Sequence, residues 1–235
     1  HGTDNARCLI ALALITGHVG RPGTGLHPLR GQNNVQGASD VGLIPMFYPD
    51  YKSVAAEASR KVYEEMWQAE LDDKPGLTVV EIMTAVHADE IKGMYIMGEN
   101  PAMSDPDVQH ARDALAKLEH LVVQDIFLNE TAKFAHVFLP GASFLENDGT
   151  FINAERRISS VRKVMSPLSG KADWEATMAF ANALRCDMTY QHPSEIMDEI
   201  AKLTPTFHGV SYSLLDELGS IQWPCNELAP EGTPT

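Results

Sequence analysis

Residues 93–141 read GMYIMGENPAMSDPDVQHARDALAKLEHLVVQDIFLNETAKFAHVFLPG, and this stretch decides the fold class. It contains three short apolar runs, at residues 93–97, 120–124 and 136–139. Between them, residues 107–118 and 129–135 have the composition and spacing of helices. Apolar strands separated by helices at this interval pair in parallel and are covered by those helices. The stretch therefore predicts an α/β fold, with a Rossmann-like parallel sheet of at least three strands covered by helices.

Polar or kinked residues follow each of the predicted strands. They are Gly98, Glu99 and Asn100 after the first strand, Gln124 and Asp125 at the end of the second, and Ser143 in the turn after the third. Ligands of open parallel sheets bind beyond the carboxyl ends of the strands. The first turn is not G-x-G-x-x-G, so the sequence lacks the nicotinamide-binding fingerprint. We expect a pocket for some other ligand at this edge of the sheet.

The rest of the chain reads as helices and long loops. Residues 3–16 have a helical pattern that is apolar on nearly all sides, so we expect a buried helix there. Residues 17–52 lack periodicity, and the region from 141 to about 171 is polar and irregular. Further helices are expected at residues 53–70, 78–88, 173–185, 193–203 and 211–218. The N-terminal part is therefore predicted to be helical, with long loops that could bind a cofactor.

One of these loops, residues 23–37, reads GTGLHPLRGQNNVQG. It combines glycines and side-chain amides with a single cation, Arg30. This composition is too irregular for the interior of a helix or strand. Its amides and one guanidinium would suit a polar ligand with many hydrogen-bond acceptors, although a glycine-rich loop can also be a plain connection.

Composition limits the classes of partner. The chain has 235 residues and a formal net charge of −14, which argues against binding nucleic acid or anionic lipid. Its three cysteines form no C-x-x-C pair and no disulfide framework, which fits a reducing compartment best. The longest apolar run, residues 8–15, is too short to span a bilayer. We expect a cytoplasmic protein without membrane contact, with a periplasmic location as the alternative.

Several segments resemble the catalytic subunits of formate dehydrogenases, which belong to the molybdopterin-guanine-dinucleotide oxidoreductases. These segments are 28–37, 95–101, 122–127, 138–141, 146–157 and 221–225. The resemblance runs in order from residue 1 to about residue 225. It implies oxidation of formate to carbon dioxide at a molybdenum or tungsten centre held by two molybdopterin guanine dinucleotides. It also implies an iron–sulfur cluster, ligated outside this chain, and electron-transfer subunits as partners.

The resemblance also implies roles for single residues. Arg30 matches the arginine that orients formate, and a guanidinium suits a planar carboxylate because it can donate two parallel hydrogen bonds. Gln32 and Gly31 match positions near the pterin. The six polar or kinked residues at the strand ends match the pocket for the guanine dinucleotide arm. Alternatives remain: Arg30 could pair with a backbone carbonyl or a pterin phosphate, Asp125 could cap a helix, and Glu99 could be a solvated charge.

A second charged group consists of Glu146 and residues 155–157, which read Glu-Arg-Arg. Ion pairs that hold a loop are one interpretation of this group. Contact with a cofactor phosphate is the other interpretation.

The metal ligand of the formate dehydrogenases, a cysteine or selenocysteine followed by histidine, has no counterpart. Cys8, Cys186 and Cys225 are followed by leucine, aspartate and asparagine. The sequence therefore resembles an internal part of the catalytic subunit that ligates no metal. We expect a helical segment with the glycine-rich loop at residues 1–90 and an α/β dinucleotide-binding part at residues 91–235. Two rival functions remain: a related oxyanion enzyme similar to nitrate reductase, and a cofactor-binding fragment without catalysis.

Overall fold

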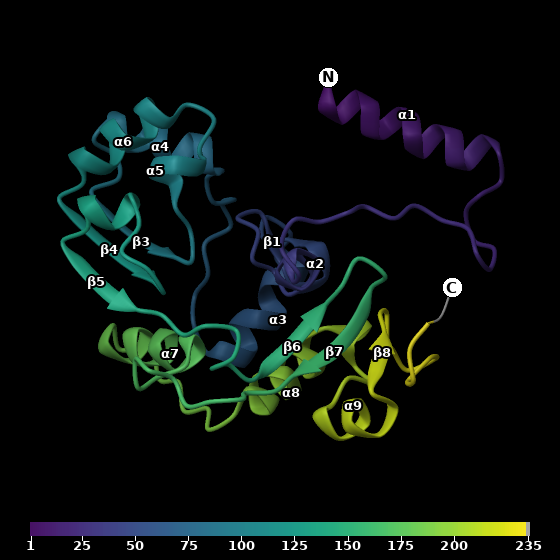
Figure 1. Cartoon of the computed structure of the whole chain (residues 1–235). Helices are drawn as coiled ribbons and strands as arrows, with labels where there is room; N and C mark the ends of the chain where they lie inside the picture. Colours follow the sequence, from purple (N-terminus) through teal and green to yellow (C-terminus); the bar gives the residue numbers. More distant parts are fainter. Residues whose placement is uncertain (234–235) are drawn as a thin grey trace.

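The structure, a computed structural model, describes residues 1–233. Figure 1 shows a parallel α/β unit, an antiparallel unit beside it, and an N-terminal helix set apart from both. The elements are α1 (Gly2–Ile15), α2 (Val35–Asp40), β1 (Phe47–Tyr48), η1 (Pro49–Tyr51), β2 (Lys52–Ser53), α3 (Glu57–Trp67), α4 (Val79–His87), β3 (Gly93–Met97), α5 (Pro101–Ser104), α6 (Val108–Lys117), β4 (His120–Asp125), η2 (Thr131–Phe134), β5 (Val137–Pro140), β6 (Gly149–Ile152), β7 (Arg157–Val161), α7 (Asp173–Ala183), α8 (Pro193–Leu203), η3 (Pro205–Phe207), α9 (Tyr212–Leu218) and β8 (Ser220–Gln222).

The parallel sheet has the order β3-β4-β5, and both of its strand pairs are parallel. In Figure 1, α4, α5 and α6 lie on one side of this sheet and α7 on the other. Alternate residues of β3 face these two layers: Ile96 joins the core with α4 and α6, whereas the Tyr95 ring stacks on Phe180 of α7 at 5.1 Å. The predicted parallel sheet covered by helices is confirmed.

Apolar burial and helix capping explain this unit. Leu121 and Val123 of β4 are fully buried, together with Leu115 of α6. The side chain of Asp107 accepts a hydrogen bond from His110 N at the start of α6, which satisfies an N–H group that the helix itself leaves free. The chain therefore enters α6 at a defined residue and returns to β4 through buried contacts.

The second three-stranded sheet is antiparallel, with the order β6-β7-β8. Its core consists of Ile152, Ile158, Met197, Phe207, Val210, Leu215, Ile221 and Cys225. The prediction that the whole region from 141 to 171 is irregular is therefore wrong for β6 and β7. Charged residues in the turn between them hid the strand pattern, and β8, which completes the sheet, lies about sixty residues further along the chain.

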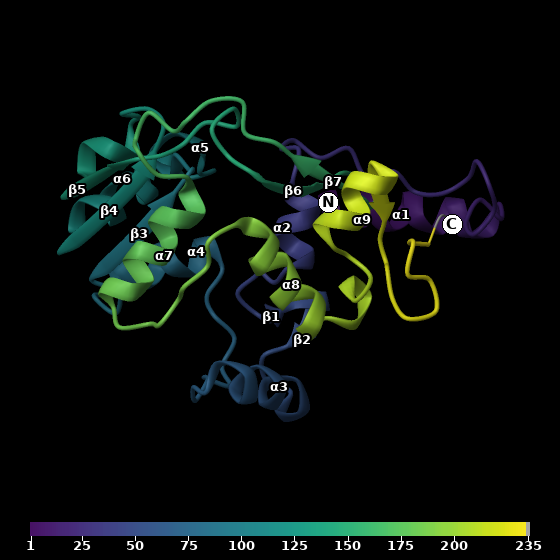
Figure 2. The same ribbon diagram turned by 90° about the horizontal axis from the view of Figure 1, so that it is seen from below.

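Two predicted helices differ from the structure. The expectation that the first helix is buried is wrong, because α1 has no buried residue and Ile15 is 81% exposed. The residues that the structure describes provide no surface that covers it, and Figure 1 shows it separate from the rest. The helix expected at 53–70 is shorter: Ser53 ends the hairpin strand β2, and α3 begins at Glu57. Figure 2 shows α3 on the side that carries β1, β2 and α8.

No helix among the described residues has the length and apolar character needed to cross a membrane.

Candidate functional site

A hollow of about 240 Å³ lies at the carboxyl end of the parallel sheet. The arrowheads of β3, β4 and β5 in Figure 1 all point toward this edge. The lining residues are Met97, Gly98, Gln124, Asp125, Ile126, Gly141, Ala142, Ser143, Phe144 and Asp173. All three strand ends therefore contribute to one concave site, where the strand order and the polar residues of the sequence predict a ligand pocket.

Gln124 and Asp173 form the polar floor of this hollow. Gln124 is 1% exposed, and its Nε2 donates a 2.8 Å hydrogen bond to Asp173 Oδ1. The same Oδ1 accepts from Ala142 N at 3.0 Å, and the Tyr95 hydroxyl donates to Gln124 Oε1. No donor among the described residues contacts Asp173 Oδ2, so this oxygen remains available to a ligand.

Asp173 was not among the residues that sequence reasoning selected. It is the first residue of α7 and follows a long loop rather than a strand. The expectation that ligands bind beyond the carboxyl ends of strands therefore does not select it. The signal available in the sequence was an acidic residue at the start of a predicted helix. Only the packing of α7 on β3 and β4 brings this carboxylate to the hollow.

Asp125 lines the hollow but bonds mainly to its own turn. Its Oδ1 accepts from Ile126 N at 2.6 Å, and its Oδ2 accepts from the Asn129 side chain at 2.8 Å. These contacts hold the turn after β4. They do not make Asp125 the cap of a helix, because the next helical segment is η2, which begins at Thr131 and has Glu130 at its N-cap position. Both oxygens keep lone pairs, because a carboxylate offers about four acceptor positions.

Two predicted residues point elsewhere. Glu99 is exposed and does not line the hollow. Asn100 Nδ2 donates to Glu130 at 2.7 Å, and its Oδ1 accepts from Thr131 N and Oγ1. Asn100 therefore fixes η2 against the end of β3.

Two glycines give the backbone at the hollow its shape. Gly98 has a φ of 67°, a left-handed conformation that favours glycine, and no atom would meet a Cβ placed there. A Cβ on Gly141 would lie 3.2 Å from the carbonyl carbon of Asp125, so the turn after β5 packs closely on β4. Glycine at both turns leaves the rim low enough for a ligand to approach the backbone.

The loop that carries Ser143 is held by a buried carboxylate. Glu146 is 5% exposed, and its two oxygens accept from Ser143 N at 2.7 Å and Leu168 N at 2.6 Å. These backbone N–H groups lower the pKa of Glu146. Glu146 therefore fixes the rim of the hollow and does not join the charged residues at 155–157, contrary to the grouping suggested by the sequence.

The glycine-rich loop lies outside this hollow, on the antiparallel unit. Asn34 Oδ1 accepts from Ile152 N of β6 at 2.9 Å. A Cβ on Gly37 would overlap Asn34 Oδ1 and lie 3.2 Å from Ile152 Cγ1. The loop is therefore anchored to β6 by a hydrogen bond and by a contact that only glycine allows.

Arg30, Gly31 and Gln32 are exposed on this loop. Arg30 Nη2 donates to the side chain of Gln36 at 3.2 Å. None of the ion pairs among the described residues includes Arg30. No carboxylate among the described residues therefore forms an ion pair with this guanidinium, and most of its N–H donors have no partner there.

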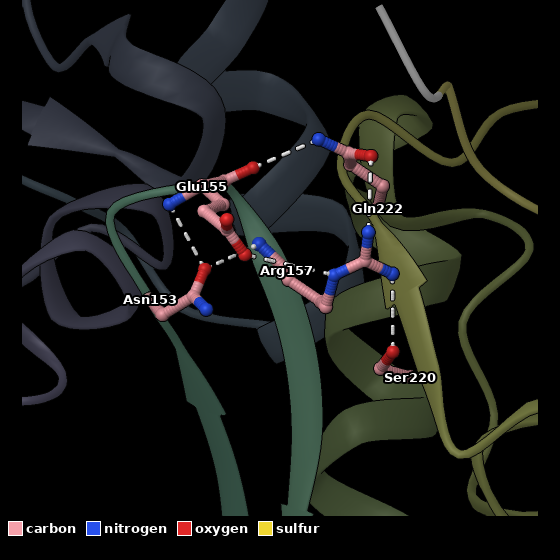
Figure 3. Close-up of polar contacts among 5 residues, drawn as sticks. All are labelled: Asn153, Glu155, Arg157, Ser220 and Gln222. Carbon is pink, nitrogen blue, oxygen red and sulfur yellow. Dashed lines mark hydrogen bonds and ion pairs between the residues drawn. The ribbon is translucent and has the colours of Figure 1, made fainter. Parts of the chain in front are cut away.

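Arg157 is used to hold the antiparallel sheet together, as Figure 3 shows. Its guanidinium donates to Ser220 Oγ at 3.1 Å and to Gln222 Oε1 at 3.5 Å, and it lies 3.9 Å from the carboxylate of Glu155. Asn153 Oδ1 accepts from the backbone N of Glu155 and of Arg157. These contacts favour the interpretation that this charged group supports the loop.

A larger hollow of about 530 Å³ lies away from the strand ends. Its lining residues are Arg60, Glu64, Glu70, Leu71, Asp72 and Asp73. The acidic majority would repel a phosphate-bearing cofactor. The smaller hollow at the strand ends is the better candidate for such a ligand.

The chain matches the family model of the molybdopterin oxidoreductases over residues 1–183. This protein belongs to the molybdopterin oxidoreductase family. Membership implies a molybdopterin cofactor that carries a metal. The predicted resemblance to this superfamily is confirmed.

Individual relatives agree with the family match. A formate dehydrogenase alpha subunit of Methanocaldococcus jannaschii is 46% identical over 99% of this chain, and a Bacillus subtilis protein named as a probable oxidoreductase is 45% identical over 96%. The chain spans 34% and 23% of their lengths, respectively. An acetylene hydratase from Pelobacter acetylenicus shares the fold, with a TM-score of 0.52 and 18% identity over 66% of this chain and 23% of its own.

The hollow at the strand ends fits part of such a cofactor. Asp173 Oδ2 and Ser143 offer acceptors, while Met97, Ile126 and Phe144 offer apolar surface for a planar ring. For the metal itself, no group of three or more His, Cys, Asp or Glu side chains in the described part of the chain is placed to hold an ion.

Proposed function

We propose that this chain is one part of the larger catalytic subunit of a formate dehydrogenase, which we call the parent enzyme. The relatives named formate dehydrogenase, at about 45% identity over nearly the whole chain, support this proposal. The observation that carries it is Arg30, an exposed guanidinium in the glycine-rich loop whose hydrogen-bond partner is the neutral Gln36.

Arg30 binds the carboxylate group of formate. Formate has almost no other surface, so its specific binding has to come through that group. A guanidinium donates two parallel hydrogen bonds to a carboxylate, which fixes both position and angle. The reaction releases carbon dioxide, one proton and two electrons, and the metal–pterin group supplies the site that accepts the electrons. The contribution of this chain is to bind and orient the substrate, with Gly31 and Gln32 next to the pterin.

The parent enzyme binds two molybdopterin guanine dinucleotides. The hollow at the strand ends binds the guanine end of one of them. Guanine presents two neighbouring N–H donors on one edge, which match a carboxylate, and Asp173 Oδ2 is an acceptor in the right kind of site. Gly98, Gln124, Asp125 and Ser143 line the same hollow. Molybdenum or tungsten, an iron–sulfur cluster and electron-transfer subunits complete the parent enzyme in a cytoplasmic location. Within the chain, residues 1–90 supply the substrate loop and residues 91–235 the dinucleotide site.

Kinetics of the purified parent enzyme test this proposal. We expect formate to reduce an oxidised dye, and we expect nitrate not to oxidise a reduced dye. Arg30→Lys keeps the positive charge but loses the two parallel donors of the guanidinium. We therefore expect kcat to fall about tenfold or more, with the metal and pterin still bound. Arg30→Ala should be slower by a further 1–3 kcal/mol or so of transition-state stabilisation. Near wild-type kcat/KM in a fully loaded Arg30→Ala enzyme would refute the role of Arg30.

A further inference from the structure

Arg30 is connected to a buried carboxyl group through one intervening amide. Arg30 Nη2 donates to Gln36 Oε1 at 3.2 Å, and Gln36 Nε2 donates to Asp40 Oδ1 at 2.7 Å. Gln36 and Asp40 are four residues apart on α2, so they lie one turn apart on the same face of this short helix. The Tyr51 hydroxyl donates to the same Asp40 Oδ1 at 2.9 Å.

Asp40 is an unusual residue for this position. It is 0% exposed, and its Oδ2 has no hydrogen-bond partner among the described residues. Burial raises the pKa of Asp40, and the hydrogen bonds from Tyr51 and Gln36 only partly oppose that shift. Burying a carboxyl group with an unsatisfied oxygen costs free energy. A neutral residue of the same shape would hold α2 at lower cost, so the carboxyl group calls for another explanation.

The direction of an amide supplies that explanation. The side chain of Gln36 has an oxygen that accepts and a nitrogen that donates, whereas the guanidinium of Arg30 can only donate. Gln36 supports Arg30 only when its oxygen faces the guanidinium. Its NH₂ group must then find an acceptor on the other side. The Oδ1 of Asp40 is that acceptor. A carboxylate presents an oxygen to Gln36 in either rotation, whereas an asparagine at this position could turn its NH₂ group toward Gln36.

We propose that Asp40 is a positioning residue for Arg30, acting through Gln36 to fix the direction in which the guanidinium presents its remaining donors. This inference rests on the proposed role of Arg30 in binding formate. Asp40 does not touch the substrate. Its effect is to remove the second orientation of Gln36, in which an NH₂ group would face Arg30 and push the guanidinium away.

The competing explanation is that Asp40 only ties α2 to η1 through Tyr51. The two explanations assign different partners to the carboxyl group. If Asp40 acts through Gln36, Gln36→Leu should reproduce the effect of Asp40→Asn. If it acts only through Tyr51, Tyr51→Phe should reproduce it instead. Tyr51→Phe is therefore the matched control, since it removes one donor from Asp40 Oδ1 and keeps the hydrogen bonds from Arg30 to Gln36 and from Gln36 to Asp40.

The first experiment measures formate oxidation by the parent enzyme, normalised to bound metal. Asp40→Asn and Gln36→Leu should each lower kcat, and with it kcat/KM, by about tenfold or more, because a misaligned arginine holds formate at the wrong angle for the reaction. The double variant should be no worse than either single variant, because both changes disrupt one connection. Tyr51→Phe should stay within about twofold of the wild-type kcat/KM. A purely structural role would change enzyme yield or metal content and leave these constants per metal unaltered.

The second experiment does not depend on catalysis. Phenylglyoxal, an arginine-selective reagent, is applied to the cofactor-free parent enzyme, and modification of Arg30 is followed by mass spectrometry with the exposed Arg21 as the internal reference. Arg30 should react about threefold faster or more in Asp40→Asn and Gln36→Leu, the effect of one lost hydrogen bond. The reactivity of Arg21 should not change.

The two experiments separate the possible failures. If Arg30→Ala oxidises formate normally but Asp40→Asn accelerates Arg30 modification, the proposed function is wrong and the positioning role stands. If Asp40→Asn and Gln36→Leu leave both the kinetics and the reactivity of Arg30 unchanged, or if Tyr51→Phe alone matches Asp40→Asn, the positioning role is wrong. Should Asp40→Asn not fold, Gln36→Leu decides by the same criteria.

Discussion

Gln124 and Asp173, 49 residues apart in the sequence, are joined by a hydrogen bond of 2.8 Å from Gln124 Nε2 to Asp173 Oδ1. This contact connects the end of β4 to the first residue of α7. It also leaves Oδ2 of Asp173, a residue that lines the hollow, without a donor from the described residues. One carboxylate therefore has both a structural oxygen and an oxygen that a ligand can use.

The first prediction follows from this division. Asp173→Ala in the parent enzyme should lower bound guanine nucleotide about tenfold, because it removes an acceptor for the ligand and leaves the buried Gln124 amide unsatisfied. Asp125→Ala should lower it less, since the carboxylate of Asp125 is already bonded to Ile126 N and Asn129. Nucleotide released by denaturation and quantified by chromatography gives the answer. Asp113→Ala, on the exposed face of α6, is the control; equal nucleotide content in all three variants would rule out the assignment of Asp173.

The second prediction concerns the pH dependence of the rim. The backbone N–H groups of Ser143 and Leu168 lower the pKa of Glu146 in the folded state. Its stabilising contribution is therefore fully present above the unfolded pKa of about 4.3 and is lost as the pH falls through the lower folded value. Glu146→Gln should speed hydrogen exchange at residues 143–146 and 164–168 at pH 7. The difference from the wild type should shrink below about pH 4; a difference that does not depend on pH would contradict the proposed cause.

The third prediction concerns the antiparallel core. Ile158 and Ile221 are directly paired across β7 and β8, and both are 0% exposed. Ile158→Ala should lower the free energy of unfolding by about 2–5 kcal/mol, and Ile158→Val by about 0.5–1.5 kcal/mol. Urea denaturation of the chain measures both values. Ser159→Ala, next to it on the opposite face of β7, should have little effect; a similar loss in this variant would mean that the side chain of Ile158 is not what stabilises the sheet.

The fourth prediction concerns the isolated chain. The Cys-His or Sec-His pair of the formate dehydrogenases has no match at Cys8, Cys186 or Cys225. The purified 235-residue chain should therefore hold no stoichiometric molybdenum or tungsten and should not oxidise formate. Elemental analysis after expression in cells that make the cofactor is the measurement. About one metal ion per chain would refute the prediction.

The sequence predicted the parts of the fold that local patterns determine. The parallel strands were found because each is a short apolar run beside segments of helical composition, and the rule about strand ends then placed Gly98, Gln124, Asp125 and Ser143 at one hollow. Asn100 obeys the same rule but turns toward Thr131, because its amide satisfies buried groups in η2. Sequence adjacency to a strand end does not fix the direction of a side chain.

The features that were missed depend on distant contacts. The antiparallel sheet needs β8 to return to β7, and Asp173 reaches the hollow only because α7 packs on the parallel sheet. The burial of α1 was wrong for a related reason. An apolar pattern indicates that a helix suits burial, but it does not say that the same 235 residues contain the surface that buries it.

The hydrogen bond between Asn34 and Ile152 has a consequence for how enzymes of this kind can diverge. It fastens the loop of Arg30 to the antiparallel sheet, whereas the hollow belongs to the parallel sheet. Under the proposed assignments, the substrate loop and the nucleotide site are supported by separate cores. Mutations in the loop of Arg30 can then change substrate specificity while binding of the nucleotide is unaffected. New activities can arise in a lineage without changes to the hollow at the strand ends.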